Sequence, residues 1–231
     1  MKALILMTRI PIPGKTKTRL MDIFTGEKCA GIHKCFLLDL FNIFNYINDD
    51  VDIFLTYTPE GNLNIIQDII PSYINCFPQT GDDLGARMGN AIGEVFNIGY
   101  TDVILIGSDI PDIQPYELLD AFSILENNDI CLGPTFDGGY YLVGMKKLHK
   151  EIFDKELKWG KKSVLEGTID IANNMELSVG LTVKHMDIDT KEDIFKFKKK
   201  VDQGLFSNRV VPENTIKYLS KFWSEAQYAE R

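Results

Sequence analysis

The feature that most constrains this chain is a series of short, continuous apolar runs separated by segments with helical periodicity. The runs lie at Ala3–Met7, Val51–Tyr57 and Val103–Ile106. Runs of this length and composition are typical of parallel strands that are buried on both faces. Between the first two runs, apolar residues recur at spacings of three and four from Cys29 to Ile47, which predicts one long amphipathic helix.

The alternation of strand and helix continues after the second run. Helical patterns cover Leu84–Phe96 and Pro115–Leu125, and a short strand is expected at Asp129–Leu132. This order predicts an α/β fold with a mainly parallel sheet and right-handed crossovers. Tyr140–Met145 follows a turn signal at 137–139, so we expect this strand to run back as a small antiparallel excursion.

The last third of the chain predicts a strand at Val179–Met186 and a helix at Asp193–Val201. The segment from 207 to 231 is expected to form one or two appended helices. A length of 231 residues is typical of one large domain, and no linker or internal repeat divides it. We therefore predict one domain over residues 1–206 and a C-terminal helical tail over 207–231.

Composition excludes several classes of function. The formal net charge is −8, which disfavours binding to duplex nucleic acid or to an anionic membrane surface. No apolar run reaches the length of a membrane span or of a signal peptide core, so we expect a cytoplasmic protein. The cysteines form no C-x-x-C pair and no zinc-ligand spacing.

The loop after the first strand is rich in cationic residues and also contains proline and glycine. It reads PIPGKTKTR over residues 11–19 and holds Gly14, Lys15, Lys17 and Arg19. A Walker phosphate loop would need a glycine where Arg9 stands, so that motif is excluded. Ligands of open α/β sheets bind at the carboxyl ends of the strands, and we expect Lys17 and Arg19 to neutralise nucleotide phosphates there. The alternative is a solvated basic turn.

Two acidic segments are candidates for a metal site. Asp109 follows the third apolar run, where a carboxylate can hold a hard divalent cation. Asp187 and Asp189 alternate at the end of a predicted strand, so their side chains share one side. Each segment also has a plain alternative role, because Asp109 precedes the helix near Pro115 and Asp189 precedes a second helix, and both could act as caps.

A glycine-rich segment precedes the second helix. It reads QTGDDLGARM over residues 79–88 and places Arg87 in the first helical turn. The dinucleotide fingerprint G-x-G-x-x-G is absent, which disfavours a nicotinamide enzyme. The absence of G-x-S-x-G removes the usual basis for a serine hydrolase. The histidines, His33 among them, are expected to be structural or exposed.

Taken together, these motifs resemble one family. PIPGKTKTRL, QTGDDLGARM, GSDIP, LGPTFDGGYYLVGM, WGKKSVLEGT and DIDTKEDI follow in that family's order over about residues 1 to 200. The sequence is similar to the glycosyltransferase-like, radical-SAM/selenodomain-associated transferases of the DUF2064 type. These belong to the nucleotide-diphospho-sugar transferase superfamily and are related to phospholactate guanylyltransferase and molybdopterin guanylyltransferase.

The resemblance implies a GT-A fold, which is a Rossmann-like three-layer sandwich, over residues 1–206. It also implies a divalent cofactor, Mg²⁺ or Mn²⁺, held by Asp109 with Asp189, or Asp187 in its place, as the second ligand. The catalytic residues it implies are Lys17, Arg19 and Asp109. The residues implied to bind the nucleotide are Gly14, Lys15, Lys17, Arg19, Gly81, Asp82, Leu84, Gly85 and Arg87. Those implied on the acceptor side are Asp137, Gly138, Tyr140 and Trp159.

The function that we expect is metal-dependent transfer from a nucleotide-activated donor to a small acceptor. Glycosyl transfer from a nucleotide-diphospho-sugar is the first choice. The alternatives are nucleotidyl transfer, which releases pyrophosphate from a nucleoside triphosphate, and a non-catalytic nucleotide-binding or scaffold protein. The base, the sugar, the acceptor and the oligomeric state are left open by the sequence.

Overall fold

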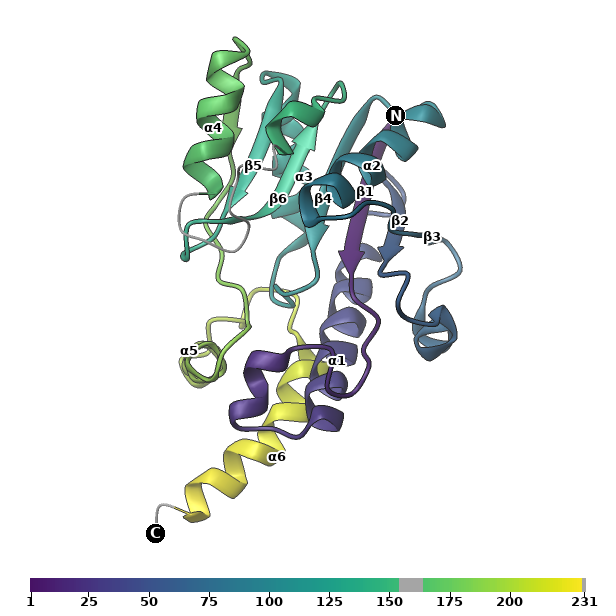
Figure 1. Cartoon of the computed structure of the whole chain (residues 1–231). Coiled ribbons are helices and arrows are strands. Elements are labelled where there is room, and N and C mark those ends of the chain that lie inside the picture. Colours follow the sequence, from purple (N-terminus) through teal and green to yellow (C-terminus); the bar gives the residue numbers. More distant parts are fainter. Residues whose placement is uncertain (154–163, 230–231) are drawn as a thin grey trace.

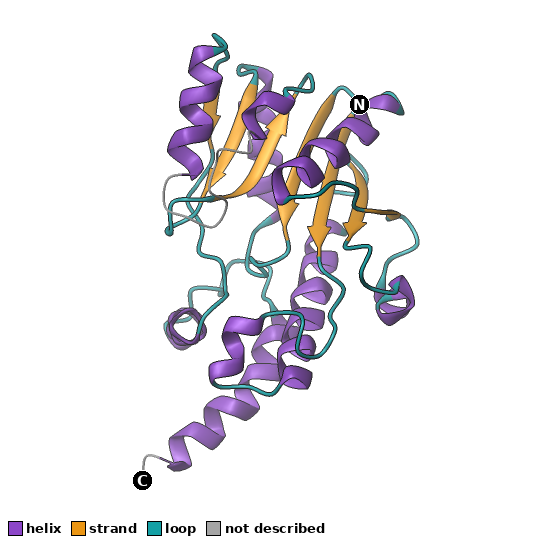
Figure 2. Ribbon diagram, viewed as in Figure 1, coloured by secondary structure: helices purple, strands orange, loops and turns teal. Residues whose placement is uncertain are grey.

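The structure is a computed structural model that describes residues 1–153 and 164–229. These residues form a seven-stranded sheet that carries helices on both faces (Figures 1 and 2). The strands are β1 (Lys2–Thr8), β2 (Asp52–Tyr57), β3 (Asn75–Pro78), β4 (Asp102–Gly107), β5 (Ile130–Pro134), β6 (Tyr140–Met145) and β7 (Val179–Leu181). The fold class predicted from the apolar runs is confirmed.

The strands are ordered β3-β2-β1-β4-β6-β5-β7, with β1 near the centre of the sheet. The β1 strand pairs in parallel with both β2 and β4, so that Leu4 lies opposite Ile53 on one side and Ile104 on the other. Only β6 runs antiparallel to its neighbours β4 and β5 among the described strands. The small antiparallel excursion expected at residues 140–145 is therefore present.

Six α-helices and four short 3₁₀-helices connect the strands within the described residues. The α-helices are α1 (Gly26–Phe44), α2 (Leu84–Asn97), α3 (Pro115–Glu126), α4 (Val164–Asn174), α5 (Lys191–Asp202) and α6 (Glu213–Ala229). The 3₁₀-helices are η1 (Thr18–Asp22), η2 (Leu63–Ile65), η3 (Gln67–Ile69) and η4 (Lys150–Phe153). The long helix predicted from the spacing of apolar residues corresponds to α1, which Thr25 caps through its side chain.

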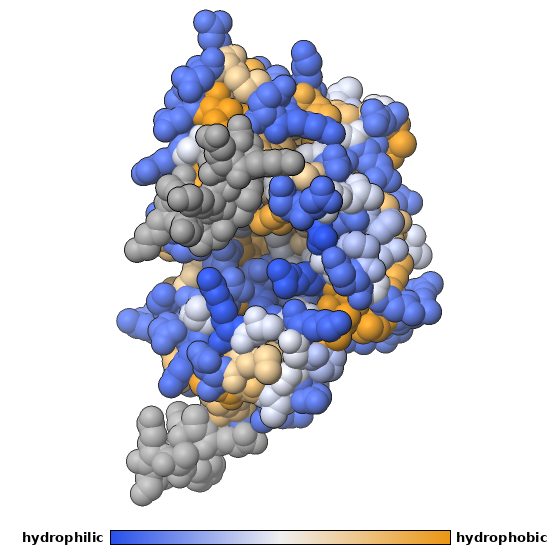
Figure 3. Space-filling view, in the orientation of Figure 1, coloured by the Kyte–Doolittle hydropathy of each residue, from blue (hydrophilic) through white to orange (hydrophobic). Residues whose placement is uncertain are grey.

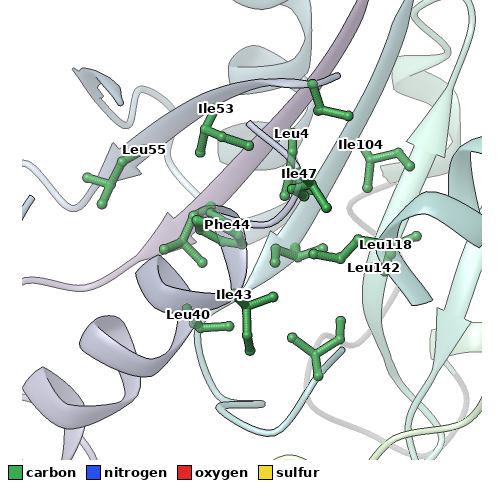
Figure 4. Packing of buried hydrophobic residues seen from close by; sticks show 14 of the residues in the cluster. Leu4, Leu40, Ile43, Phe44, Ile47, Ile53, Leu55, Ile104, Leu118 and Leu142 are labelled. Carbon is green, nitrogen blue, oxygen red and sulfur yellow. The ribbon is translucent and has the colours of Figure 1, made fainter. Parts of the chain in front are cut away.

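Alternate residues of the central strands feed two separate hydrophobic cores. Leu4 and Leu6 of β1 belong to the core that includes residues of α1 and α3, part of which is shown in Figure 4. Ala3 and Ile5 of the same strand belong to the core that includes residues of α2 and α4. Because side chains alternate across a strand, this arrangement buries both faces of the sheet and produces three layers.

A third hydrophobic cluster lies beyond the carboxyl edge of the sheet. It joins η1, α1, α5 and α6 through buried residues such as Leu20, Phe36, Phe197 and Leu219. In Figure 1 the C-terminal helix α6 lies beside α1, and the two helices are in contact. The division of the chain at residue 207 stays a prediction, but the helix beyond it shares a core with segments from before it.

The structure differs from the predicted elements in three places. The edge strand β3 was not expected, because its residues are mostly exposed and carry little apolar pattern. Helix α4 was also not predicted. The strand expected over 179–186 ends at Leu181, and His185 forms an isolated bridge to Thr135, so the segment that leads to Asp187 is not a strand. Among the described helices, none is both long enough and apolar enough to cross a membrane.

Candidate functional site

A cavity of about 660 Å³ opens at the carboxyl ends of β1, β2 and β4. In the face shown in Figure 3, the surface is hollowed at mid-height and hydrophilic residues border the hollow. The lining comes from the loop after β1, the start of α2, the loop after β4 and the segment around Asp187 and Asp189. Segments far apart in the sequence thus meet at the edge where ligands of open α/β sheets bind.

The loop after β1 is folded so that one lysine points inward. Thr16 is buried, donates from its hydroxyl to the carbonyl of Ile10 at 2.9 Å and accepts from the amide of Ile12 at 3.1 Å. Lys17 follows in the left-handed conformation with φ 51°. A non-glycine residue in this region costs about 1 kcal/mol or more, so the surrounding contacts must hold it there.

The ammonium group of Lys17 joins two acidic residues that the sequence singled out. Its Nζ lies 2.6 Å from Asp109 Oδ1 and 2.8 Å from Asp189 Oδ1, and it donates to the carbonyl of Ile188 at 2.7 Å. The amide of Ile188 in turn donates to the carbonyl of Asp109 at 2.9 Å. The Phe36 ring lies 5.0 Å from the same ammonium. The lysine side chain is only 3% exposed, so this cluster is an internal one.

These carboxylates are not helix caps. The N-cap of α3 is Gln114, which forms a capping box with Glu117. The N-cap of α5 is Thr190, which forms a capping box with Asp193. The plain role that the sequence left open for Asp109 and Asp189 is therefore filled by other residues, and both carboxylates line the cavity instead.

The charges in this cluster are unbalanced. Burial by itself would lower the pKa of Lys17, but Asp109 and Asp189 outweigh it and the pKa is raised. Burial opposes ionisation of Asp109, yet Lys17 and other cationic groups hold its pKa below the ordinary value. Burial, followed by repulsion from Asp109 and Asp189, raises the pKa of Asp187 to about 8. At pH 7 the Asp187 carboxyl is therefore mostly protonated, and one ammonium group faces the two carboxylates of Asp109 and Asp189.

Arginine side chains supply further positive charge to the cavity. Arg19 is 66% exposed and its Nη1 lies 4.0 Å from Asp189 Oδ2. Arg87 donates from Nε to the carbonyl of Gly81 at 3.0 Å and pairs with Glu60 at 3.0 Å. Arg9, an exposed residue that sequence reasoning did not select, also lines the cavity. Guanidinium groups in such a place can bind phosphate oxygens in a bidentate way.

The base of the cavity is a buried polar cluster that the sequence did not reveal. Thr8 Oγ1 lies 2.9 Å from His33 Nε2 and donates to Ser108 Oγ at 3.1 Å. His33 Nε2 also lies 3.2 Å from the carbonyl of Arg9, which can only accept, and this contact assigns the proton to Nε2. Burial is the main cause that lowers the pKa of His33 to about 4, so the ring is neutral at pH 7. The helical position of His33 in α1 carried no signal of this placement.

The structure places most of the predicted side chains in the cavity and several glycines outside it. The predicted residues that line it are Lys17, Arg19, Asp82, Leu84, Arg87, Asp109, Tyr140, Asp187 and Asp189. Gly14, Lys15, Gly81, Gly85, Asp137 and Gly138 are not among its lining residues in the described part of the chain. Trp159 lies outside the described residues.

Two of the predicted residues outside the cavity have clear structural roles. Gly81 has φ 133°, and a Cβ there would lie 2.9 Å from the amide nitrogen of Arg87. A side chain at this position would therefore disturb the turn that orients Arg87. Asp137 accepts from the amide of Gly139 at 3.2 Å within the turn between β5 and β6.

The donor set suits a hard divalent cation in its chemistry. Asp109, Asp187 and Asp189 offer carboxyl oxygens, the ligands that Mg²⁺ and Mn²⁺ take. Burial, and after it repulsion from Asp109 and Asp189, raises the pKa of Asp187, so acidic groups crowd this part of the cavity. The side chains as they lie in the structure do not form a complete metal-binding site. Over residues 1–153 and 164–229, no three such side chains are grouped so that they could hold a metal ion. Lys17 occupies one oxygen of Asp109 and one of Asp189.

Comparison with known proteins identifies the family of this chain. The family described as "uncharacterized protein conserved in bacteria (DUF2064)" matches residues 46–161, half of the chain. The chain belongs to the DUF2064 family. The resemblance to this family that the sequence motifs indicated is therefore confirmed.

Individual relatives of this DUF2064 protein extend the comparison. It is 27% identical over 186 residues to 2-phospho-L-lactate guanylyltransferase of Methanocaldococcus jannaschii, covering 77% of this chain and 75% of the relative. A candidate nucleotide-diphospho-sugar transferase from Desulfovibrio desulfuricans G20 has a TM-score of 0.85 at 28% identity, with 96% of each chain covered. A 4-diphosphocytidyl-2C-methyl-D-erythritol synthase from Anaerococcus prevotii has a TM-score of 0.58 at 14% identity, with 87% of this chain and 96% of that chain covered. At this identity the similarity shows the fold alone. The fold is that of the nucleotide-diphospho-sugar transferases.

Proposed function

We propose that this protein transfers a nucleotidyl group from a nucleoside triphosphate to a small acceptor and releases pyrophosphate. The observation that carries the proposal is the cavity at the carboxyl edge of the sheet, where Arg9, Arg19 and Lys17 gather on one loop opposite Asp109 and Asp189. A nucleoside triphosphate carries more negative charge than a nucleotide-diphospho-sugar, so it gains more from this concentration of cations. The similarity to a guanylyltransferase supports nucleotidyl transfer.

In the proposed reaction an oxygen of the acceptor attacks the α-phosphorus of the donor. A new oxygen–phosphorus bond forms, and the bond from the α-phosphorus to the oxygen that bridges to the β-phosphate breaks. The electron pair of that bond leaves with pyrophosphate, which therefore gains negative charge in the transition state. Groups that stabilise developing charge supply most of the rate enhancement in such transfers.

The residues of this chain have separate tasks in that step. Arg19 is exposed and lies 4.0 Å from Asp189 Oδ2. Its guanidinium group would stabilise negative charge on the leaving phosphates. Arg87 is oriented by Gly81 and Glu60 and lines the part of the cavity formed by the start of α2. Tyr140 lies on β6, where it would bound the acceptor side.

A divalent cation, when bound, would offset negative charge on the donor phosphates. Asp109 and Asp189 would hold it, with Asp187 as a further oxygen donor. The contact of Asp109 and Asp189 with one ammonium nitrogen, and the position of Asp109 just beyond the end of β4, support this assignment. All three carboxylates line the cavity.

Glycosyl transfer is the second candidate, and it was the first choice from the sequence motifs. The similarity over 96% of both chains to a candidate nucleotide-diphospho-sugar transferase favours it. The same cations would then take charge on a nucleoside diphosphate, because the bond broken is the one between the sugar carbon and the β-phosphate oxygen.

The test is a two-stage measurement on the purified full chain. First, the four nucleoside triphosphates and a panel of nucleotide-diphospho-sugars are compared by thermal shift with and without Mg²⁺. A ligand at about 100 times its Kd stabilises the folded state by roughly 2.7 kcal/mol, which is easily measured. Second, the best donor is incubated with small phosphorylated hydroxy acids, beginning with 2-phospho-L-lactate.

The product identifies the reaction. Pyrophosphate release that depends on the acceptor supports nucleotidyl transfer, whereas nucleoside diphosphate release from a sugar donor supports the second candidate. Stabilisation by none of the nucleotides would overturn both proposals.

A further inference from the structure

The ammonium group of Lys17 contacts the same carboxylates that are assigned to a divalent cation. Sequence reasoning assigns Lys17 to the phosphates and Asp109 with Asp189 to the metal. The structure places all three groups in one contact, with Lys17 Nζ 2.6 Å from Asp109 Oδ1 and 2.8 Å from Asp189 Oδ1. Two assigned roles therefore compete for the same atoms.

The ammonium group has no donor left for a ligand in this arrangement. A lysine ammonium carries three N–H donors and no acceptor. Its three hydrogen-bonding partners are the two carboxylate oxygens and the carbonyl of Ile188, 2.7 Å away. The side chain is 3% exposed, so a nucleotide in the cavity cannot reach the ammonium as it stands.

The carboxylates, in contrast, face the cavity. The side chain of Asp109 is 38% exposed and that of Asp189 is 34% exposed. A cation that enters from the cavity thus meets oxygens that are already held together by a buried ammonium group. Mg²⁺ binds oxygen at about 2.0–2.1 Å, closer than the ammonium nitrogen lies, so a cation that binds Oδ1 of both carboxylates takes the place of the ammonium there.

We propose that Lys17 is a built-in counter-ion of the Asp109–Asp189 pair, that a divalent cation must displace it, and that the displaced ammonium then turns toward the donor phosphates in the cavity. This rests on the proposed function in one respect, which is the assignment of Asp109 and Asp189 to the cation. Lys17 is thereby a positioning residue before the cation binds and a phosphate-binding residue afterwards.

Features of the loop support an exchange of this kind. The left-handed backbone at Lys17 aims the side chain inward at an energetic cost, and the contacts to Asp109 and Asp189 offset that cost. A lysine has a flexible four-carbon stem and a compact charge, so it can leave one partner for another without movement of the backbone. Arg19, already within 4.0 Å of Asp189 Oδ2, stays beside the pair when Lys17 leaves.

The first experiment measures binding of Mn²⁺ alone by calorimetry and by paramagnetic resonance, with no nucleotide present. Lys17→Met keeps much of the side-chain volume and removes the competing charge, so the Kd for Mn²⁺ should fall by about ten-fold or more. The matched control is Lys200→Met, which also removes a lysine from a buried aspartate. Lys200 Nζ lies 2.7 Å from Asp112 Oδ2, and neither residue lines the cavity in the described part of the chain.

The control variant should bind Mn²⁺ as the parent does, and Asp109→Asn should lose the binding. Equal or weaker Mn²⁺ affinity in Lys17→Met would overturn the proposal. That result would mean that Lys17 only positions the carboxylates and does not compete with the cation for them. Unchanged binding in Asp109→Asn would also overturn it.

A second measurement uses the parent protein and does not depend on the folding of any variant. Acetylation of lysines by a mild reagent, quantified by peptide mass spectrometry, reports how far each ammonium is protected. Saturating Mn²⁺ should increase the labelling of Lys17 several-fold and leave that of Lys200 unchanged. Continued protection of Lys17 while Mn²⁺ is bound would overturn the displacement.

These outcomes are separable from a failure of the proposed function. The product assay with nucleotides tests the transfer, and the Mn²⁺ measurements need no donor and no acceptor. Pyrophosphate release together with unchanged Lys17 protection would leave the transfer standing and remove the exchange.

Discussion

Thr8 Oγ1 lies 2.9 Å from His33 Nε2 at the base of the cavity, which ties the end of β1 to the long helix α1. The same imidazole contacts the carbonyl of Arg9, where the ligand-binding loop begins. His33 is therefore a structural support of the loop, and it acts in its neutral form.

We expect acid to destabilise the protein through this histidine. The pKa of His33 is lowered from 6.5 to about 4, chiefly because the ring is buried. The unfolded state thus binds more protons than the folded state between these values, so the stability contribution is present above pH 6.5 and is lost as the pH falls toward 4. The full loss amounts to about 3 kcal/mol. Urea unfolding at several pH values from 7 to about 4.5 measures it.

His33→Gln removes the titrating group and should flatten this dependence. His149→Gln changes a histidine outside the cavity and should keep the parent's dependence. Parallel curves for the parent and His33→Gln would assign the acid sensitivity to other groups.

Arg19→Lys tests whether the exposed guanidinium takes charge on the leaving phosphates. Lysine keeps the charge and loses the fork that binds two phosphate oxygens together, so turnover should fall by roughly 10² to 10³. Since the Arg19 side chain is 66% exposed, stability should change by no more than about 0.5 kcal/mol. Steady-state turnover with the best donor and a melting curve are the measurements. Arg209→Lys, an exposed arginine outside the cavity, serves as the control, and near-parental turnover of Arg19→Lys would return the loop to the role of a solvated basic turn.

Substitution of the acidic residues tests which of them hold the cation. Asp109→Asn should weaken Mg²⁺-dependent nucleotide binding while the fold survives, because the amide keeps the volume and loses the charge. Asp189→Asn should cost more affinity than Asp187→Asn, since Asp189 and Asp109 contact the same ammonium nitrogen and already lie side by side. Calorimetric titration of the donor with and without Mg²⁺ measures this.

Asp112→Asn, at a buried aspartate paired with Lys200, is the matched control for these variants. Equal donor affinity for Asp109→Asn and the parent in both conditions would remove the metal assignment.

The anchoring of α6 predicts a purely structural effect. Asp39 in α1 is buried and accepts from Asn214 N at 3.0 Å, Asn214 Nδ2 at 2.8 Å and Thr215 N at 2.9 Å. Asp39→Ala leaves these donors without their acceptor, so it should destabilise the protein by about 2–3 kcal/mol. Chemical denaturation measures the loss, and the exposed Ser220→Ala is the control. A change below about 0.5 kcal/mol would show that hydrophobic packing alone holds the helix.

The sequence by itself determined the layered α/β fold. The apolar run at Ala3–Met7 and its two counterparts can only be buried from both sides, and the spacing from Cys29 to Ile47 produces an apolar stripe without reference to any other segment. These are local properties, so they could be predicted. The edge strand β3 was missed for the same reason, because its residues are mostly exposed and its pairing with β2 rests on backbone hydrogen bonds rather than on a pattern of side chains.

The composition of the site was decided only by the tertiary structure. The sequence marks Lys17, Asp109 and Asp189 as separate candidates, but it does not show that one ammonium joins two carboxylates from segments 92 and 172 residues further along the chain. The sequence offers Asp189 as a cap of the following helix, but in the structure Thr190 is the N-cap of α5. His33 entered the cavity because α1 packs with that face of the helix toward the end of β1. Such contacts follow from the packing of distant elements, which no local periodicity encodes.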